Sequence, residues 1–438
     1  MMNNYSAESP TMNMDLVVGT TDAGILLPME IWEHVIDLIA EKVERQWNLL
    51  KCPWWLTLIS CALTCKALYN RARWHLRGNV MLLTQSNVVS FARLLRAEPY
   101  LRPVMRFVTI AGSPSRRHLP IPHIGTFAIM LARCLPRMQA LVITNANWTI
   151  GSIRQQDIVN LAAFRCINEL TLQDIRFATV SQLGQLISSV PQLQILRCAR
   201  IKCNQKVSPL VLPPLPLNST RLRIGHLEDT MSPAIHDFLY RILTSANLLR
   251  LSVGAHHRDI SSSLIKLQRL LDACAWCLRD LRLTLNMKGV VDQSPEKLCE
   301  HINLSRFRRL RSLRFSTWCY VDSDYSWIPH LLYTVVTFIV DLKIIFHVSV
   351  TNWEERLSAL LHRLETGNEL AELDTFLATP RIDIRPGNPL VQVLLALEGS
   401  GSTYNPCKSR ISDDEWSKLV RGKMPHADEC GILRTIIY

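Results

Sequence analysis

Apolar residues recur along most of the chain in the pattern Φ-x-x-Φ-x-Φ, in which Φ is an apolar residue. Clear copies begin at residues 138, 167, 193, 246, 278, 310 and 339, and weaker copies begin at residues 105 and 219. The middle apolar positions of these nine copies are 33, 29, 26, 26, 27, 32, 32 and 29 residues apart. Such even spacing indicates a structural repeat, whereas the alternative, a chance product of a leucine-rich sequence, would not be evenly spaced.

Between the copies, the apolar spacing changes to that of an amphipathic helix. Ser232 and Pro233 are suited to begin one such helix before residues 235–243, and Pro191 is suited to end another over residues 180–190. A strand and a helix in every repeat predict parallel strands joined by helical crossovers. The predicted fold class is therefore α/β, with an irregular curved solenoid and a parallel sheet over residues 79–400, and with a period close to that of leucine-rich repeats.

Residues 24–78 have a helical pattern without this repeat. Pro28 suits the first turn of a helix, and Glu30 and Glu33 suit the positive end of its dipole. Apolar residues then recur every four positions over residues 27–39, and a second apolar stripe covers residues 58–72. Two amphipathic helices cannot bury both stripes alone, so a third element or a partner must cover them.

This segment resembles an F-box, in the form common in large fungal F-box families. The resemblance rests on Leu-Pro-x-Glu-Ile-Trp at residues 27–32 and on Cys-Ala-Leu-Thr-Cys-Lys-Ala-Leu-Tyr at residues 61–69. In that family the F-box is a small three-helix module that binds the Skp adaptor of a cullin-RING ubiquitin ligase, and the rest of the chain, often leucine-rich-repeat-like, selects the target protein. The resemblance implies adaptor contacts from Leu27, Pro28, Ile31, Val35, Ile36, Leu63 and Tyr69. The alternative is that the stripe is ordinary core of a helical cap on the solenoid.

The predicted strands also place cations on one face. Because side chains alternate along a strand, the residue between the last two apolar positions points to the open, concave face. That position holds a cation in six successive repeats, namely Arg197, Arg223, Arg250, Arg282, Arg314 and Lys343. Like charges on strands ~4.8 Å apart repel one another, so this row favours binding of an acidic or phosphorylated segment of a target protein. The alternative is a solvated polar face.

Composition and charge leave other functions open. The chain has 438 residues, of which 48% are hydrophobic and 20% charged, as in a globular protein. The net charge of +12 is uneven, since residues 1–50 carry −6 and residues 51–120 carry +10. A basic solenoid could instead bind nucleic acid, but the aromatic residues do not interleave with the arginine row, which argues against it. An interaction scaffold without any link to a ligase is the third alternative.

Motifs for catalysis or cofactor binding are not found. The sequence contains no phosphate-binding glycine loop, dinucleotide fingerprint, H-E-x-x-H or G-x-S-x-G. Cys274 and Cys277 form a single C-x-x-C within a predicted amphipathic helix, where packing is favoured over zinc or redox chemistry. The spacing of Cys52, Cys61, Cys65 and His75 does not match a zinc finger. We therefore expect a protein that is not an enzyme, without catalytic residues, metal or cofactor.

The remaining segments predict location and boundaries. Residues 1–23 form a polar leader expected to be disordered, without the basic and apolar regions of a signal peptide, so a cytoplasmic or nuclear protein is expected. The apolar run 331–340 is too short for a membrane span and predicts a buried helix followed by a strand. Residues 401–438 predict a linker and one short helix around Trp416.

Overall fold

The computed structural model of the chain describes residues 28–44, 53–112, 118–149, 151, 153–204, 219–228, 232–256, 260–286, 301–321, 323–349, 352–379, 392–400 and 411–437. Leu27, the leader of residues 1–23 and the segment 287–300 lie outside these described residues.

The N-terminal part is a bundle of three helices, α1 (Met29–Glu44), α2 (Pro53–Thr64) and α3 (Lys66–Arg77). The apolar stripe over residues 58–72 is therefore not one helix. Cys65 has an extended backbone (φ −157°, ψ 163°), is exposed, and separates α2 from α3. This break lets the helices fold on one another around a small core of Ile36, Ala40, Val43, Leu58 and Ala72.

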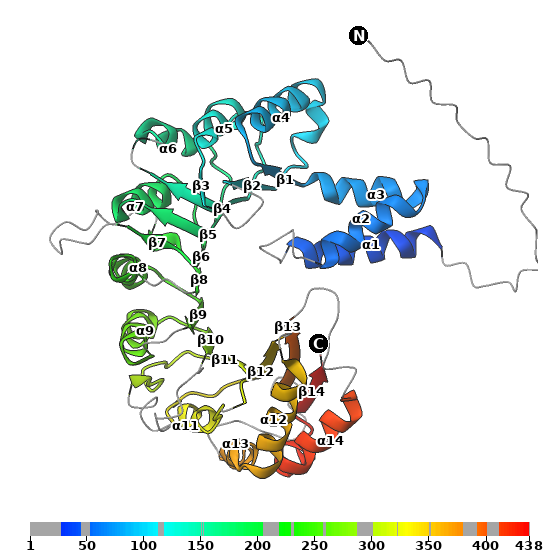
Figure 1. Cartoon of the computed structure of the whole chain (residues 1–438), viewed down its shortest axis with the longest axis vertical. Helices are drawn as coiled ribbons and strands as arrows, with labels where there is room; N and C mark the ends of the chain where they lie inside the picture. Colours follow the sequence, from blue (N-terminus) through cyan, green and yellow to red (C-terminus); the bar gives the residue numbers. More distant parts are fainter. Residues whose placement is uncertain are drawn as a thin grey trace, which may run out of the picture.

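The bundle leads through α3 into an arch whose inner wall is a parallel sheet and whose outer side is covered by helices (Figure 1). Within the described residues the sheet has 14 strands, in the order β1-β2-β4-β5-β6-β8-β9-β10-β11-β12-β13-β14, with β3 paired to β4 and β7 paired to β5. Every strand pair is parallel, as the alternation of strand and helix predicts.

The strands are β1 (Asn79–Leu82), β2 (Phe107–Ala111), β3 (Leu119–Pro120), β4 (Ala140–Trp148), β5 (Glu169–Phe177), β6 (Ile195–Ala199), β7 (Lys202–Cys203), β8 (Ile224–Glu228), β9 (Arg250–His256), β10 (Asp280–Asn286), β11 (Ser312–Trp318), β12 (Asp341–Ser349), β13 (Gln392–Ser400) and β14 (Leu433–Ile437). The outer helices are α4 (Gln85–Ala97), α5 (His123–Leu131), α6 (Gln155–Leu161), α7 (Val180–Ser188), α8 (Pro233–Ser245), α9 (Ile260–Cys274), α11 (Trp327–Tyr333), α12 (Trp353–Thr366), α13 (Glu369–Leu377), α14 (Asp413–Lys423) and α15 (Pro425–Glu429). Short 3-10 turns cover Pro99–Leu101 and Ser219–Arg221.

The main core lies between the sheet and the outer helices. Apolar residues of successive strands stand in register, and one row across the sheet is made of buried leucines: Leu141, Leu170, Leu196, Leu251, Leu281, Leu313 and Leu342. The apolar stripe predicted for α8 is buried against them. Each fully buried leucine contributes about 1.5–3 kcal/mol, so the stacked rows are the main source of stability in the solenoid.

All nine predicted strands have a counterpart, as β2, β4, β5, β6 and β8 through β12, but two of them are displaced along the sequence. The middle positions of β8 and β9 are held by Gly225 and Leu251, which follow the predicted Leu222 and Leu249 by three and two residues.

The predicted end of the solenoid at residue 400 differs from the structure. The short helix around Trp416 is present as α14, but the chain then returns to the sheet, where β14 pairs with β13. In β14, Thr435 stands opposite Leu395, at a position that is apolar in the other repeats, so the apolar pattern does not reveal this strand. The α/β solenoid therefore runs from residue 79 to residue 437.

The apolar run of residues 331–340 divides as predicted, into the end of buried helix α11 and the approach to strand β12. Among the described residues, we find no helix whose length and apolar content would let it span a bilayer.

Candidate functional site

Apolar side chains face solvent on the three-helix bundle, although the bundle has a core of its own. On α1, Ile31, Val35 and Leu38 are exposed and follow the i, i+4, i+7 spacing of one helix face. Helical geometry places this face roughly opposite the buried residues Ile36 and Ala40. Leu63, at the end of α2, is 80% exposed. We call the exposed apolar residues of α1–α3 the bundle face: Met29, Ile31, Trp32, Val35, Leu38, Trp54, Leu56, Leu63, Tyr69 and Trp74.

Most of the residues predicted to bind an adaptor belong to this exposed surface. Pro28, Ile31, Val35, Leu63 and Tyr69 are exposed. Ile36 is only 1% exposed, because it packs inside the bundle core, so it supports the surface from within and does not form part of it.

Sequence reasoning did not select several large residues of the bundle face. Trp32, Leu38 and Trp54 are exposed, and Leu38 continues the spacing of Ile31 and Val35 by one helical turn. That continuation is the signal by which Leu38 could have been found. An exposed apolar area of this kind, outside a satisfied core, is typical of a surface that another protein covers.

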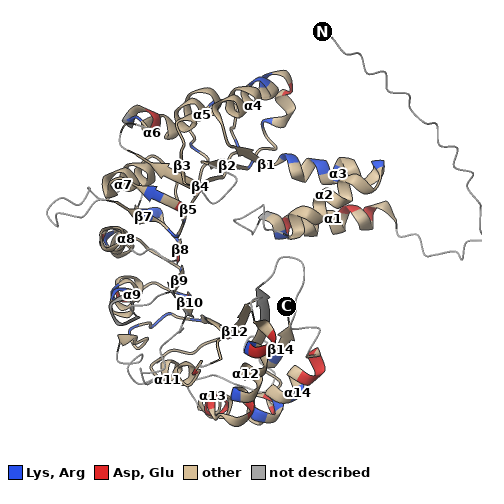
Figure 2. Ribbon diagram, in the orientation of Figure 1, with Lys and Arg blue, Asp and Glu red and all other residues tan. Residues whose placement is uncertain are grey.

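An ionic clasp joins α1 to α3 and fixes the geometry of the bundle. The guanidinium of Arg71 donates to both carboxylate oxygens of Asp37, at 2.7 Å and 2.5 Å, and His75 Nε2 lies 2.8 Å from Asp37 Oδ1. Figure 2 shows acidic residues on α1 and basic residues on α3. The hydrogen bond from Arg71 is the main cause that lowers the pKa of Asp37 from 3.8 to about 2.

The clasp predicts a pH dependence of bundle stability. Because the pKa of Asp37 is lower in the folded state, its stabilising contribution is complete above 3.8 and is lost as the pH falls towards about 2. Hydrogen exchange of the α1 amides, corrected for intrinsic rates, should accelerate over that range. In Asp37→Asn, exchange should be faster at neutral pH and should lack this acid-dependent step. Glu30→Gln, on the same helix, is the control and should keep the step, and an unchanged profile in Asp37→Asn would contradict the role of the clasp.

The second candidate surface is a charged hollow on the concave face of the arch. It has a volume of about 490 Å³, and its lining includes four of the cations predicted to bind a target, Arg197, Arg250, Arg282 and Arg314. Strands β6 and β8 through β12 supply this lining, so residues up to 144 positions apart in the sequence, Arg197 and Asp341, lie together. Four of the six predicted cations therefore line one hollow, and their role in target binding stays a prediction.

The six cations do not form the single uninterrupted row that the sequence predicts. The row that crosses the strands in register consists, from β6 and β8 to β12, of Arg197, His226, Ser252, Arg282, Arg314 and Lys343. Arg223 lies before β8 and donates to the carbonyl oxygen of Asn247, and Arg250 stands beside Asp280, one row away. The difference begins at Gly225, which occupies the usual leucine position, where a Cβ would lie 3.3 Å from Leu251 Cδ1.

Carboxylates also neutralise part of this surface, which the apolar pattern could not show. Arg197 Nε donates to Glu169 at 2.7 Å, Arg250 Nε lies 2.7 Å from Asp280, and Lys343 Nζ lies 3.2 Å from Asp341. The three acids stand at strand positions two residues before the row that contains Arg197, Arg282 and Lys343, and they lie on the same face of the sheet. Because each of these three cations has a carboxylate beside it, the repulsion between cations is smaller than the sequence suggests.

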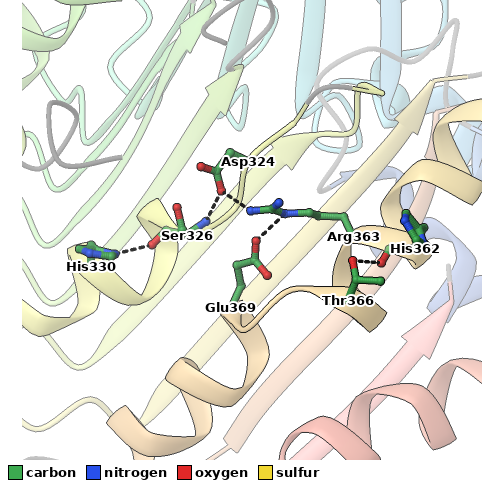
Figure 3. Close-up of polar contacts among 7 residues, drawn as sticks. All are labelled: Asp324, Ser326, His330, His362, Arg363, Thr366 and Glu369. Carbon is green, nitrogen blue, oxygen red and sulfur yellow. Dashed lines mark hydrogen bonds and ion pairs between the residues drawn. The ribbon is translucent and has the colours of Figure 1, made fainter. Parts of the chain in front are cut away.

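A third polar cluster, near the C-terminal end of the arch, joins helices to one another (Figure 3). Arg363 of α12 donates to Glu369 of α13 at 2.7 Å and to Asp324 at 3.2 Å, while the Ser326 amide donates to Asp324 at 3.0 Å. Glu369 is buried, so its charge requires this partner. The cluster therefore fixes α11, α12 and α13 relative to one another and is structural.

The cysteines of the predicted C-x-x-C are buried, as packing residues would be. Burial raises the pKa values of the Cys274 and Cys277 thiols and keeps them protonated. Cys198 is also buried, and its pKa is raised to about 12. Among the described residues, no group of three or more His, Cys, Asp or Glu side chains has the arrangement of a metal site.

The strand order, the parallel register and the outer helices define an α/β solenoid of the leucine-rich-repeat type. No protein-family model and no curated protein matches the chain. Similar solved structures include the leucine-rich repeat-containing protein LegL7 from Legionella pneumophila, with 13% identity and a TM-score of 0.40 over 82% of this chain and 90% of that chain. A chain of the Rad7 and Elc1 complex in yeast has 12% identity and a TM-score of 0.40, covering 93% and 87%. An internalin from Listeria monocytogenes has 13% identity and a TM-score of 0.24, covering 77% and 81%. At these values no functional conclusion follows from the likeness.

Proposed function

We propose that this protein is a substrate-recruiting subunit of a Skp-cullin-F-box type ubiquitin ligase. In this function the bundle face binds a Skp-type adaptor, which connects the chain to a cullin scaffold, and the solenoid binds a target protein. The chain itself performs no chemistry. It holds the target near a ubiquitin-loaded enzyme and thereby raises the effective concentration of the target's lysines.

The observation that carries this proposal is the exposure of the bundle face. The bundle closes on a core of its own, separate from that of the solenoid, and yet keeps large apolar side chains in solvent. A helical cap would instead bury these side chains against the solenoid. Exposed residues at helical spacing suit docking of helices onto a partner protein. Their positions coincide with the segments that resemble an F-box.

The solenoid supports target binding through its concave face. The charged hollow collects residues from six strands, β6 and β8 through β12, and repeat proteins commonly bind partners on such extended concave surfaces. Arg197, Arg282, Arg314 and Lys343 are the cations of one row, and Arg250 joins them from the next. An acidic or phosphorylated segment of the target is the proposed ligand.

Adaptor binding tests the proposal. The double variant Ile31→Glu, Leu63→Glu places two carboxylates on the bundle face at side chains that are 46% and 80% exposed, so folding should be preserved. Burying such charges against an apolar partner is costly, and we expect co-purification with a recombinant Skp-type adaptor to fall at least about tenfold. The measurement is the amount of adaptor retained on the immobilised full chain, with circular dichroism as a check on folding.

Ile129→Glu is the matched control, because Ile129 is 67% exposed on α5 of the solenoid. It should retain the adaptor as the unmodified chain does. Failure of the unmodified chain to retain any adaptor would reject the ligase function and leave the scaffold alternative. Equal retention by the double variant and the control would show that binding does not use the bundle face.

A further inference from the structure

The edge of the sheet at which the strands begin is strongly basic. Because all strands are parallel, the loops that lead from the outer helices into the strands share this edge, which we call the amino edge. Its part from β4 to β12 comprises residues 132–139, 162–168, 189–194, 219–223, 246–249, 275–279, 302–311 and 334–340. These eight loops contain no Asp, Glu or Lys, but they contain Arg133, Arg137, Arg165, Arg221, Arg223, Arg279, Arg306, Arg308, Arg309 and Arg311.

The arginines of the amino edge are not neutralised as the concave face is. Within the part of the chain that the structure describes, Arg306 alone among the ten has a carboxylate partner, Asp272, at 3.3 Å. Arg221 donates to the side chain of Gln192, and Arg223 donates to a backbone carbonyl. Figure 2 shows acidic residues elsewhere on the arch, on helices such as α13 and α14. The amino edge therefore has a positive field that an anionic partner can neutralise.

The last three of these loops surround a hollow of about 660 Å³, a volume within the range of ligand sites. Arg279, Arg308, Arg309 and Arg311 line it together with Val336 and Phe338. Phe338 is 60% exposed and Val336 is 56% exposed, so the hollow combines apolar surface with arginines that have no carboxylate partner among the described residues. This pairing of features distinguishes it from the concave hollow, whose cations have acidic neighbours.

We infer that this hollow binds an acidic peptide segment of a partner protein, with an apolar side chain of that segment against Phe338 and Val336. The segment's carboxylates accept hydrogen bonds from the planar donors of Arg308, Arg309 and Arg311. An apolar anchor inside a ring of charge-assisted contacts is a typical centre of a protein interface. The site lies on the solenoid, apart from the bundle face, so the inference does not depend on adaptor binding.

A peptide fits this hollow better than a single strand of nucleic acid. Apart from Phe338, its apolar wall is aliphatic, formed by Leu310, Val336 and Val340, and such side chains give no flat platform for stacked bases. Among the described residues that line it, Thr337 is the one besides the arginines whose side chain can donate or accept a hydrogen bond. The hollow therefore offers few groups that could recognise the edges of nucleic-acid bases, whereas an aliphatic or aromatic side chain of a peptide can pack against its apolar wall.

Fluorescence anisotropy with the full chain tests the inference. The probe is a labelled pool of 12-residue peptides with six fixed glutamates and with Leu, Ile, Phe or Trp between them. We expect saturable binding at low salt that weakens as salt is raised. Arg308→Glu with Arg311→Glu should weaken binding about tenfold or more, because attraction becomes repulsion, and Phe338→Ala should weaken it about threefold or more through loss of apolar contact.

Arg93→Glu with Arg96→Glu is the charge-matched control, because both arginines are exposed on α4 and the change in net charge is the same. This control should bind the peptide pool as the unmodified chain does. An equal loss in the control, a loss confined to the concave variant Arg282→Glu with Arg314→Glu, or no saturable binding would each overturn the inference. Tighter binding of a 12-nucleotide oligouridylate that displaces the peptides would overturn it in favour of nucleic acid. Adaptor retention, measured separately, should be unchanged in the Arg308→Glu, Arg311→Glu variant, so the two proposals can fail independently.

Discussion

Trp416→Ala should lower the free energy of unfolding of the C-terminal repeats by about 3–5 kcal/mol, the usual cost of removing a large buried aromatic side chain. Trp416 is fully buried beneath β12–β14 and meets the ring of Phe346 edge-on, with 6.4 Å between ring centroids. Its indole N–H donates to the carbonyl oxygen of Leu395 at 3.4 Å. Alanine would leave a cavity at this position and remove the hydrogen bond to β13.

Urea unfolding followed by far-UV circular dichroism measures this effect without relying on tryptophan fluorescence. Because each repeat of a solenoid contacts its neighbours only, we expect an early transition of the C-terminal repeats, and a later one for the rest of the arch. Trp276→Ala removes an equally large side chain that is mostly exposed, and it should change the unfolding curve little. A Trp416→Ala curve that coincides with that of the control would show that α14 does not stabilise the sheet.

Asp374→Ala should also destabilise the C-terminal repeats strongly. Asp374 is a buried residue of α13 whose two carboxylate oxygens accept the backbone N–H groups of His426 and Ala427, at 3.0 Å and 2.8 Å. These N–H groups belong to the first turn of α15, where no helical carbonyl is available to them. Each buried donor left without an acceptor costs about 1–3 kcal/mol, so we expect a total loss of about 2–4 kcal/mol.

Asp374→Asn keeps one carbonyl oxygen and should lose less stability than Asp374→Ala. Glu365→Ala, which removes an exposed carboxylate of α12, is the control and should change the unfolding midpoint little. Chemical denaturation of the three variants side by side checks the order. Equal stabilities of Asp374→Ala and Glu365→Ala would show that the cap of α15 contributes nothing.

The repeat could be predicted from the sequence wherever leucine-like residues fill all three apolar positions. At β5, Ile167, Leu170 and Leu172 all point into the core, and the strand lies where the pattern predicts it. At β13, Leu390, Val393 and Leu395 also fit the pattern, and this strand could have been found from the same signal. At β14, the polar Thr435 interrupts the pattern, and only pairing with β13 identifies the strand.

The charged surface was harder to predict, because its geometry depends on register. A glycine at position 225 has no side chain to mark the leucine position, and the side chains of Leu248 and Leu251 fill the space in its place. The pattern therefore selects Leu222 as the middle residue, three positions too early, and assigns Arg223 to the concave face. The acids that pair with the cations lie on neighbouring strands, which a linear sequence does not bring together.

On the three-helix bundle, the F-box-like sequence segments indicated which helices carry exposed apolar residues, but not which of those residues face solvent. The position of each residue around its helix decides that. Ile31 and Val35 point to solvent, whereas Ile36, the next residue, turns inward by about 100° and joins the core. The break at Cys65, which creates the third helix, has no proline or glycine to mark it. It depends on packing of α3 against α1 through the Asp37 clasp, a contact between residues 34 positions apart.

The position of β14 has a consequence for shortened forms of this protein. Residues 433–437 cover one side of β13, whose core-facing side chains are apolar. A premature stop codon upstream of α14 would remove that cover and uncover a row of unpaired backbone N–H and C=O groups. The new edge on β13 has nine residues, whereas the edge strand β14 of the intact sheet has five. A longer edge recruits strands from other molecules more readily, so the truncated product should aggregate more than the intact protein.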